Sequence, residues 1–304
     1  MSKHVAVLMG GWSSEREVSL TSGRACAKAL AERGYRVTPV DVGRDLGAVL
    51  DRLKPDVAFN ALHGPFGEDG AVQGLLEIIG LPYTHSGVLA SALAMSKPAA
   101  KQIWAGIGLP MAEGRVVHRS AFRGGDVLPR PYVIKPLNEG SSVGVHIVFD
   151  GDNYQPQDDA GWRFGDEVLV ERYIPGREIQ VAVLGDEVLG AIEIRPRGRF
   201  YDYEAKYTDG KAEHLMPAPI HPEVYENVCA MALQAHQALG CRGATRSDWR
   251  YDDTQGEPGA LFLLEINTQP GMTPLSLVPE IAAHRGLSFG DLVSWIVEDA
   301  SCAR

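Results

Sequence analysis

Apolar residues in the amino-terminal part of the chain form short continuous runs, separated by longer segments in which they recur every three or four positions. The runs at residues 4–11, 35–42 and 56–64 have the length of buried strands. The periodic segments at 13–34 and 71–80 predict helices, and Ser14 and Glu17 have the spacing of a capping box at the start of the first. Strands that alternate with helices predict a parallel sheet with right-handed crossovers.

The pattern changes after a helical segment at 88–108, which Pro98 interrupts. Short apolar runs separated by turns then predict an antiparallel α+β arrangement, with strands over 116–118, 130–137, 142–150, 167–174, 178–185 and 187–196. Periodic segments at 221–240 and 286–300 predict two further helices. A polar, tyrosine-rich segment at about 195–219 is expected to be a mobile loop.

These changes predict both α/β and α+β structure. We expect an amino-terminal α/β domain with an open parallel sheet over residues 1–95. A central subdomain over 96–182 and a carboxy-terminal domain over 183–304 should contain antiparallel sheets.

Composition narrows the classes of partner. The 304 residues carry a formal net charge of -10, which argues against nucleic acid and against anionic membrane surfaces. No apolar segment approaches the length of a transmembrane helix. The four cysteines lack C-x-x-C spacing, which favours free thiols in a reducing cytoplasm.

An acid and an amide end the apolar run LFLLEIN. Glu265 and Asn267 lie two residues apart, so they share one face of an extended strand. Asp248 ends another predicted strand and could add a third oxygen ligand for a hard cation such as Mg²⁺. Taken alone, the same pattern also fits a strand end that meets solvent.

Three other segments could contact a ligand. The glycine-rich loop HGPFGEDG follows a strand, where open α/β sheets bind ligands, although a plain strand-to-helix turn fits equally. Glu15 could bind an ammonium group or complement a helix dipole. The hairpin loop EGSSVG offers backbone N–H groups to phosphate, and Lys135 adds a charge, but a polar hairpin tip is the simpler alternative.

Two acids flank a turn between predicted strands. Glu171 and Glu178 could bind the ribose or the amine of a nucleotide, or they could form a solvated edge. Neither a dinucleotide fingerprint nor a Walker motif occurs in the chain.

The order of these motifs is more specific than any one of them. HGPFGEDG, EGSSVG, YDYEAKY and NTQPGMTPLSLVP occur in turn along the chain. Together they resemble the D-alanine:D-alanine ligases of the ATP-grasp superfamily, over a region from Val5 to about Val297. The resemblance implies that the antiparallel part forms a two-part ATP-grasp fold.

The resemblance also implies a reaction. ATP phosphorylates the carboxylate of one D-alanine, and the amine of a second attacks the acyl phosphate to give D-alanyl-D-alanine for peptidoglycan precursors. The implied cofactors are ATP and two Mg²⁺ ions, for which Mn²⁺ can substitute. The implied setting is a cytoplasmic homodimer.

Roles for individual residues follow from the resemblance, position by position. The metal ligands would be Asp248, Glu265 and Asn267, and the nucleotide-binding residues would be Lys97, Lys135, Glu171, Glu178 and Lys206. The first substrate's ammonium group would bind Glu15, in a network with Ser141 and Tyr207, and its carboxylate would lie near His63. The oxyanion donors would be Arg246 and the Gly271 N–H, and the second substrate's carboxylate would bind Ser276 and the backbone of Leu277.

Three alternatives stay open at this stage. One is another ATP-grasp carboxylate–amine ligase, and another is a nucleotide-binding regulator on a decayed ligase scaffold. The third is a D-alanine:D-lactate or D-serine ligase. The tyrosine at Tyr207 favours the dipeptide-forming members, because phenylalanine at this position goes with ester-forming relatives.

Overall fold

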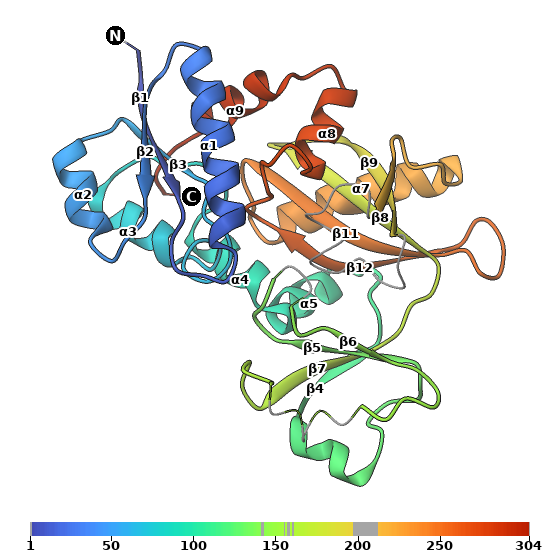
Figure 1. The fold of residues 1–304 in the computed structure, drawn as a ribbon. Coiled ribbons are helices and arrows are strands. Elements are labelled where there is room, and N and C mark those ends of the chain that lie inside the picture. The colour runs from blue at the N-terminus through green and yellow to red at the C-terminus, as the bar shows by residue number, and fades with distance from the viewer. Residues whose placement is uncertain are drawn as a thin grey trace.

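The computed structural model describes residues 2–140, 143–154, 156, 159, 161–196 and 212–303. Within these residues the chain forms one parallel and two antiparallel sheets, as the sequence predicts (Figure 1). The segment expected to be a mobile loop lies partly outside them.

The amino-terminal sheet has the strand order β2-β1-β3 and is parallel throughout. Its strands are β1 (His4–Met9), β2 (Arg36–Asp41) and β3 (Val57–Asn60). Alternate β1 residues pack in different cores: Val5 and Val7 contact the core beneath α1, while Ala6 and Leu8 contact the core beneath α2 and α3. Because both faces of β1 are buried, the strand is a continuous apolar run instead of an alternating one.

Helices cover both faces of this sheet. They are α1 (Arg16–Glu32), α2 (Leu46–Leu53) and α3 (Ala71–Ile79). The last helix of the chain, α9 (Phe289–Glu298), packs beside α1, and Ser301 bridges to Tyr83 (Figure 1). The carboxyl end therefore belongs to the same core as the amino-terminal sheet.

The predicted capping box on α1 is wrong. The helix begins at Arg16 with Glu15 at the N-cap, and no side chain caps it. The Ser13 hydroxyl instead accepts from Glu15 N at 3.2 Å and donates to the carbonyl of His63 at 2.6 Å. The serine next to the predicted cap therefore ties the helix start to the loop after β3.

The helical segment at 88–108 is broken at Ser96, two residues before the predicted break at Pro98. It consists of α4 (Val88–Met95) and α5 (Lys97–Gly106), with Pro98 in the first turn of α5. Proline fits there because the first N–H groups of a helix have no partner within the helix.

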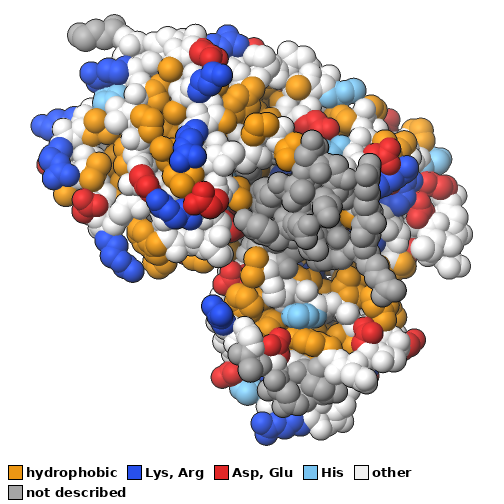
Figure 2. Space-filling view, in the orientation of Figure 1, with side chains coloured by type: hydrophobic (Ala, Val, Ile, Leu, Met, Phe, Trp, Pro, Cys, Tyr) orange, Lys and Arg blue, Asp and Glu red, His pale blue; other side chains and the backbone are white. Residues whose placement is uncertain are grey.

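A four-stranded antiparallel sheet with the order β4-β7-β5-β6 forms the lobe at the bottom of Figures 1 and 2. It contains β4 (Gly114–His118), β5 (Tyr132–Pro136), β6 (His146–Val148) and β7 (Glu167–Arg172), with a 3-10 helix over Arg119–Gly124. Its small core joins Phe122 to Tyr132, Ile134 and Val170.

The five-stranded antiparallel sheet has the order β10-β9-β8-β11-β12. Its strands are β8 (Arg177–Leu184), β9 (Glu187–Pro196), β10 (Ala212–Leu215), β11 (Ala244–Asp252) and β12 (Ala260–Asn267). One face packs against α5 and α7 (Pro222–Ala238) in a shared apolar core. The other face packs against α8 (Leu277–His284) at one end only. The other end of this face carries the charged residues described below.

Candidate active site

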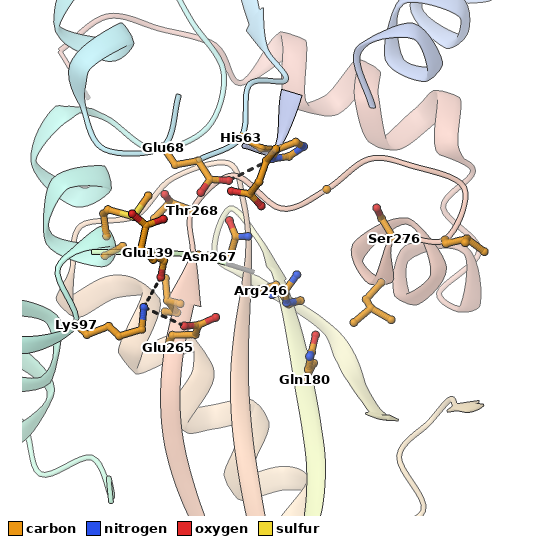
Figure 3. Close-up of a pocket in the computed structure, with 18 residues that line it drawn as sticks. His63, Glu68, Lys97, Glu139, Gln180, Arg246, Glu265, Asn267, Thr268 and Ser276 are labelled. Carbon is orange, nitrogen blue, oxygen red and sulfur yellow. Dashed lines mark hydrogen bonds and ion pairs between the residues drawn. The ribbon is translucent and has the colours of Figure 1, made fainter. Parts of the chain in front are cut away.

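Two pockets meet between the three sheets. The interface pocket lies between the amino-terminal loops and the five-stranded sheet (Figure 3), and the intersheet pocket lies between the two antiparallel sheets. Lys97, Glu139 and Glu265 line both, so the pockets are contiguous. Every predicted site residue in the described part of the chain lines at least one of them. Ser141, Lys206 and Tyr207 lie outside the described residues.

One face of β11 holds a row of charged side chains, because alternate residues point the same way. Arg246 forms two hydrogen bonds with Asp248: Nε donates to Oδ1 at 2.7 Å, and Nη2 donates to Oδ2 at 3.0 Å. Asp248 pairs in register with Glu265 of β12, and the register then shifts at Trp249. This bulge keeps the two carboxylates on neighbouring strands at the pocket, while the fully buried Trp249 packs on the opposite face.

Two carboxylates and an amide therefore line one wall. Asn267 follows Glu265 on the same strand, and its Oδ1 accepts from the backbone N–H of Gln269 at 2.8 Å. Among the described residues, no three His, Cys, Asp or Glu side chains are grouped closely enough to form a metal site by themselves. The oxygen donors suit Mg²⁺, which commonly takes only one or two protein carboxylates and completes its shell with water and substrate phosphate.

Glu171 and Lys135 line the intersheet pocket, and Lys101 lies beside Glu171. Glu171 is 3% exposed, contacts Lys101, and lies 2.6 Å from Lys135 Nζ. Burial favours the neutral acid, but Lys135 and Lys101 outweigh it and hold the pKa of Glu171 below its usual value. Glu171 therefore stays ionised and fixes both lysines in place.

Lys97 lines both pockets, and Figure 3 shows it beside Glu139 and Glu265 in the interface pocket. Its Nζ donates to the backbone carbonyl of Glu139 and lies 3.8 Å from Glu265. Burial lowers the pKa of Lys97, and the charge of Glu265 opposes that shift. Burial also raises the pKa of Glu139, against the effect of Lys97. The junction thus holds one cation between two acidic residues.

The amino-terminal wall is built from loops. His63 Nδ1 lies 3.2 Å from Glu68 Oε1, and its Nε2 lies 3.2 Å from Ser22 Oγ. Glu15 is 6% exposed and lines the same pocket. A Cβ on Gly64, where φ is +73°, would come within 2.8 Å of Glu15 Oε2. Glycine there lets the backbone approach the carboxylate closely.

The opposite end of the interface pocket is formed by the segment that leads into α8. A Cβ on Gly271 would come within 2.8 Å of Ser276 Oγ, so only glycine fits without displacing that side chain. Ser276 is the N-cap of α8, yet its hydroxyl accepts from Thr273 N at 2.9 Å instead of capping the helix. Leu277 begins the helix, whose first N–H groups point to where an anion would be stabilised.

Several lining residues were not predicted, among them Glu68, Glu139, Gln180 and Arg250. Lys101, which contacts Glu171, was also not predicted. Gln180 and Arg250 could have been found from period two, because each lies two residues beyond a predicted site residue. Lys101 lies one helical turn after Lys97. Glu68 and Glu139 stand inside motifs that the sequence analysis treated only as loops.

The family models and the curated proteins named below, which match this chain, are all described as D-alanine–D-alanine ligases. The family model described as D-ala D-ala ligase C-terminus matches residues 103–298, and that described as D-ala D-ala ligase N-terminus matches residues 46–86. The chain is 61% identical to D-alanine–D-alanine ligase B of Mesorhizobium japonicum, over 100% of this chain and 99% of that protein. It is 60% identical to D-alanine–D-alanine ligase of Agrobacterium fabrum, with 99% of each covered.

Solved structures agree. The crystal structure of D-alanine–D-alanine ligase from Bacillus anthracis has a TM-score of 0.85 and 33% identity, covering 98% of this chain and 97% of that one. The same enzyme complexed with ATP has a TM-score of 0.82 and 32% identity, with the same coverage. In the described residues, no helix is both long and apolar enough to cross a membrane.

Proposed function

The chain belongs to the D-alanine–D-alanine ligase family, and we propose that it joins two D-alanine molecules into D-alanyl-D-alanine with the cleavage of ATP to ADP and phosphate. The family and the fold class predicted from the sequence are confirmed. The observation that carries the proposal is the shared wall of the two pockets. Lys97 and Glu265 line both, so a phosphate held from the intersheet side meets a carboxylate held from the other side.

The intersheet pocket would hold the nucleotide. The Bacillus anthracis relative is described with ATP, which supports ATP as the ligand of the corresponding site here. Lys135 and Lys97 would neutralise phosphate oxygens, and Glu171 would keep Lys135 oriented. Glu178 would accept from the ribose hydroxyl groups.

Asp248, Glu265 and Asn267 would hold Mg²⁺, because their side chains line the contiguous pockets: Asp248 the intersheet pocket, Asn267 the interface pocket and Glu265 both. When bound, Mg²⁺ neutralises charge that develops on the transferred phosphoryl group. Arg246 keeps Asp248 in place through two hydrogen bonds.

The interface pocket would hold the two substrates. Glu15 would bind the ammonium group of the first D-alanine, and His63 would donate to its carboxylate. After phosphoryl transfer the second amine attacks the acyl carbon, and Arg246 with the Gly271 N–H would stabilise the oxyanion of the tetrahedral intermediate. Ser276 and the start of α8 at Leu277 would bind the carboxylate of the second D-alanine.

Three assigned residues lie in the segments outside the described residues. Ser141 and Tyr207 would form a hydrogen-bond network with Glu15, and Lys206 would reach the transferred phosphate. These roles, like the domain boundaries at residues 95 and 182, stay predictions that rest on the family resemblance.

The cellular setting also belongs to the proposal. We place the enzyme in the cytoplasm, where it would supply peptidoglycan precursors as a homodimer. Exposed apolar side chains at the end of α3 and the start of α4 offer a surface for the second copy: Ile78 is 86% exposed and Leu89 is 68% exposed. Sedimentation at micromolar concentration would measure the assembly.

Product formation tests the proposal directly. The purified chain with ATP and Mg²⁺ should release ADP when D-alanine is added and should form D-alanyl-D-alanine, identified by mass. L-Alanine alone should release no ADP above background, and D-lactate offered with D-alanine should give little ester. ADP release with D-alanine but without dipeptide, or a preference for another acceptor, would overturn the assignment.

A further inference from the structure

Arg250 is the third charged residue on the pocket-facing side of β11. Arg246, Asp248 and Arg250 alternate along the strand, so all three side chains point toward the cleft. The first two have roles in the proposed reaction, whereas the third has none so far. Its side chain is 19% exposed and lines the intersheet pocket.

The guanidinium group binds the link between the two antiparallel sheets. Residues 173–176 connect β7 to β8. Arg250 Nε donates to the carbonyl of Ile174 at 3.1 Å, and Nη2 donates to the carbonyl of Gly176 at 2.7 Å. The planar fork of arginine can fix two carbonyls at once, which a single ammonium group cannot do in the same geometry.

The link also lies very close to β11. Gly176 has φ +88°, and a Cβ at this position would come within 2.1 Å of the carbonyl oxygen of Tyr251. Only glycine allows this approach. The link is therefore pressed against the strand beside Arg250, and its hydrogen bonds to the arginine set where the sheet-to-sheet connection runs along the pocket.

The same arginine reaches the proposed ribose-binding acid. Arg250 Nη1 lies 3.9 Å from Glu178 Oε2, while Gln180 Nε2 donates to Glu178 Oε1 at 3.2 Å. The carboxylate is thus held from both sides. Arg250 and Glu178 are direct neighbours across the β8–β11 ladder, so the contact is built into the strand register.

We propose that Arg250 is a nucleotide-positioning residue, which holds Glu178 and the link at 173–176 in the arrangement that receives the nucleoside part of ATP. The inference rests on the proposed function, since it assumes that the intersheet pocket binds ATP. Arg250 acts through Glu178 and two backbone carbonyls, away from the residues that would contact the transferred phosphate. Its loss should therefore weaken nucleotide binding and leave the chemical step nearly intact.

A purely structural role predicts something different. If Arg250 only joined the two sheets, its replacement would lower the melting temperature and the active fraction, while the KM for ATP would not change. A nucleotide-positioning role separates KM from kcat. Direct binding of ADP measures the same effect without turnover.

Arg177 provides a matched control. It is also 19% exposed, and it binds Glu193 Oε2 at 2.5 Å and the carbonyl of Pro219 at 2.7 Å. It lies on β8 next to Glu178, yet it is not among the described residues that line either pocket. Arg177→Met should therefore lower stability without a selective effect on nucleotide affinity.

The experiment compares wild type, Arg250→Met, Arg250→Lys and Arg177→Met. It measures the Kd for Mg²⁺–ADP by calorimetry, the KM for ATP and for D-alanine, kcat, and the melting temperature. Arg250→Met should raise the ADP Kd and the ATP KM by about 10- to 100-fold, with kcat within about threefold of wild type and an unchanged KM for D-alanine. Arg250→Lys should show a smaller rise, because lysine keeps the charge and loses the fork.

The outcomes separate the two proposals. If wild type makes D-alanyl-D-alanine and the Arg250 variants bind ADP as wild type does, the inference about Arg250 is overturned and the proposed function stands. If the Arg250 and Arg177 variants lose affinity and melting temperature in the same proportion, the role is structural and the inference also fails. If Arg250→Met does not fold, the lysine variant decides by the same criteria. Wild type that neither binds ADP nor forms the dipeptide would overturn the proposed function itself.

Discussion

The two halves of the interface pocket are built in different ways. The amino-terminal half places its residues on loops beyond the strands: Glu15 precedes α1, and His63 and Glu68 follow β3. The half from the five-stranded sheet places Arg246 and Glu265 within the strands. The first set is oriented by local hydrogen bonds, and the second by the ladder of the sheet.

This difference shows what each half depends on. Strand residues take their direction mainly from period two and from register. The loop residues depend on local hydrogen bonds: Ser13 binds the His63 carbonyl, Glu68 and Ser22 contact the His63 ring, and Met272 N donates to the Ser22 hydroxyl at 3.2 Å. Through Ser22 the amino-terminal loops are connected to the segment beside Gly271.

The largest expected effect is on the strand half. Glu265→Gln should reduce kcat by about 1,000-fold or more and leave the fold intact, because it removes a charge from the proposed Mg²⁺ site opposite Asp248. Steady-state kinetics at saturating ATP, with Mg²⁺ varied, measure the loss. The exposed acid Glu187 lies on β9 of the same sheet, so Glu187→Gln serves as a control. Near-normal turnover of Glu265→Gln would contradict the metal assignment.

The next prediction tests the support behind β11. His236 of α7 is 2% exposed, and its Nδ1 lies 2.8 Å from Thr245 Oγ1, beside Arg246. Burial lowers the pKa of His236 to about 4, and the charge of Asp186 only partly opposes this. The unfolded chain takes up the proton near pH 6.5, and the folded chain does so only near pH 4. The buried neutral imidazole of His236 therefore makes its full contribution to the unfolding free energy above pH 6.5. This contribution is lost as the pH falls from 6.5 to 4.

Wild type should lose about 3 kcal/mol more unfolding free energy between pH 7 and pH 4 than His236→Gln does. Chemical denaturation at several pH values measures both, and the exposed residue His284 provides the control variant His284→Gln. Equal pH dependence in wild type and His236→Gln would show that the buried imidazole is not the group that titrates.

The loop half should respond more weakly to a single change. Glu68→Gln keeps an acceptor for His63 Nδ1 and removes the negative charge, so His63 stays oriented while its donor strength falls. We expect kcat/KM for D-alanine to drop by about 10- to 100-fold, with the KM for ATP unchanged. A rise in the KM for ATP instead would place Glu68 in the nucleotide half of the cleft.

The sheets and the strand half of the site could be predicted because both follow from period two. The apolar runs predicted β1, β2, β3 and the strands from β4 to β9, and the Glu-x-Asn spacing predicted Glu265 and Asn267 on one face. Arg250 and Gln180 share the faces of Asp248 and Glu178 by the same spacing, but periodicity does not show how far along a strand the pocket extends.

One helix that contributes to the site was not predicted. The sequence analysis assigned no helix to Leu277–His284, a segment that contains Pro279. Pro279 is the third residue of α8, where its missing N–H has no helical partner in any case. The loop half shows the same limit: Glu68 reaches His63 only through the folded path of residues 63–70, which no spacing rule gives.

The smallest expected effect concerns the contact that joins the halves. Gln269 follows β12, and Asn60 ends β3. Gln269 Nε2 donates to the Asn60 carbonyl at 2.6 Å, and Asn60 Nδ2 donates to Gln269 Oε1 at 3.0 Å. Both side chains are buried, at 2% and 1% exposed. Gln269→Met keeps the volume but removes both bonds, which should cost about 1–2 kcal/mol of unfolding free energy. Asn60 Nδ2 still donates to the Gly67 carbonyl at 3.0 Å, so the loss of unfolding free energy should stay small.

If the Gln269–Asn60 pair aligns the two halves of the pocket, the KM for D-alanine should rise by a few-fold in Gln269→Met while the ADP Kd stays constant. A double-mutant cycle with Asn60→Leu measures the coupling by denaturation. Additive losses would mean that the halves are aligned elsewhere, through the Ser22 and Met272 contact.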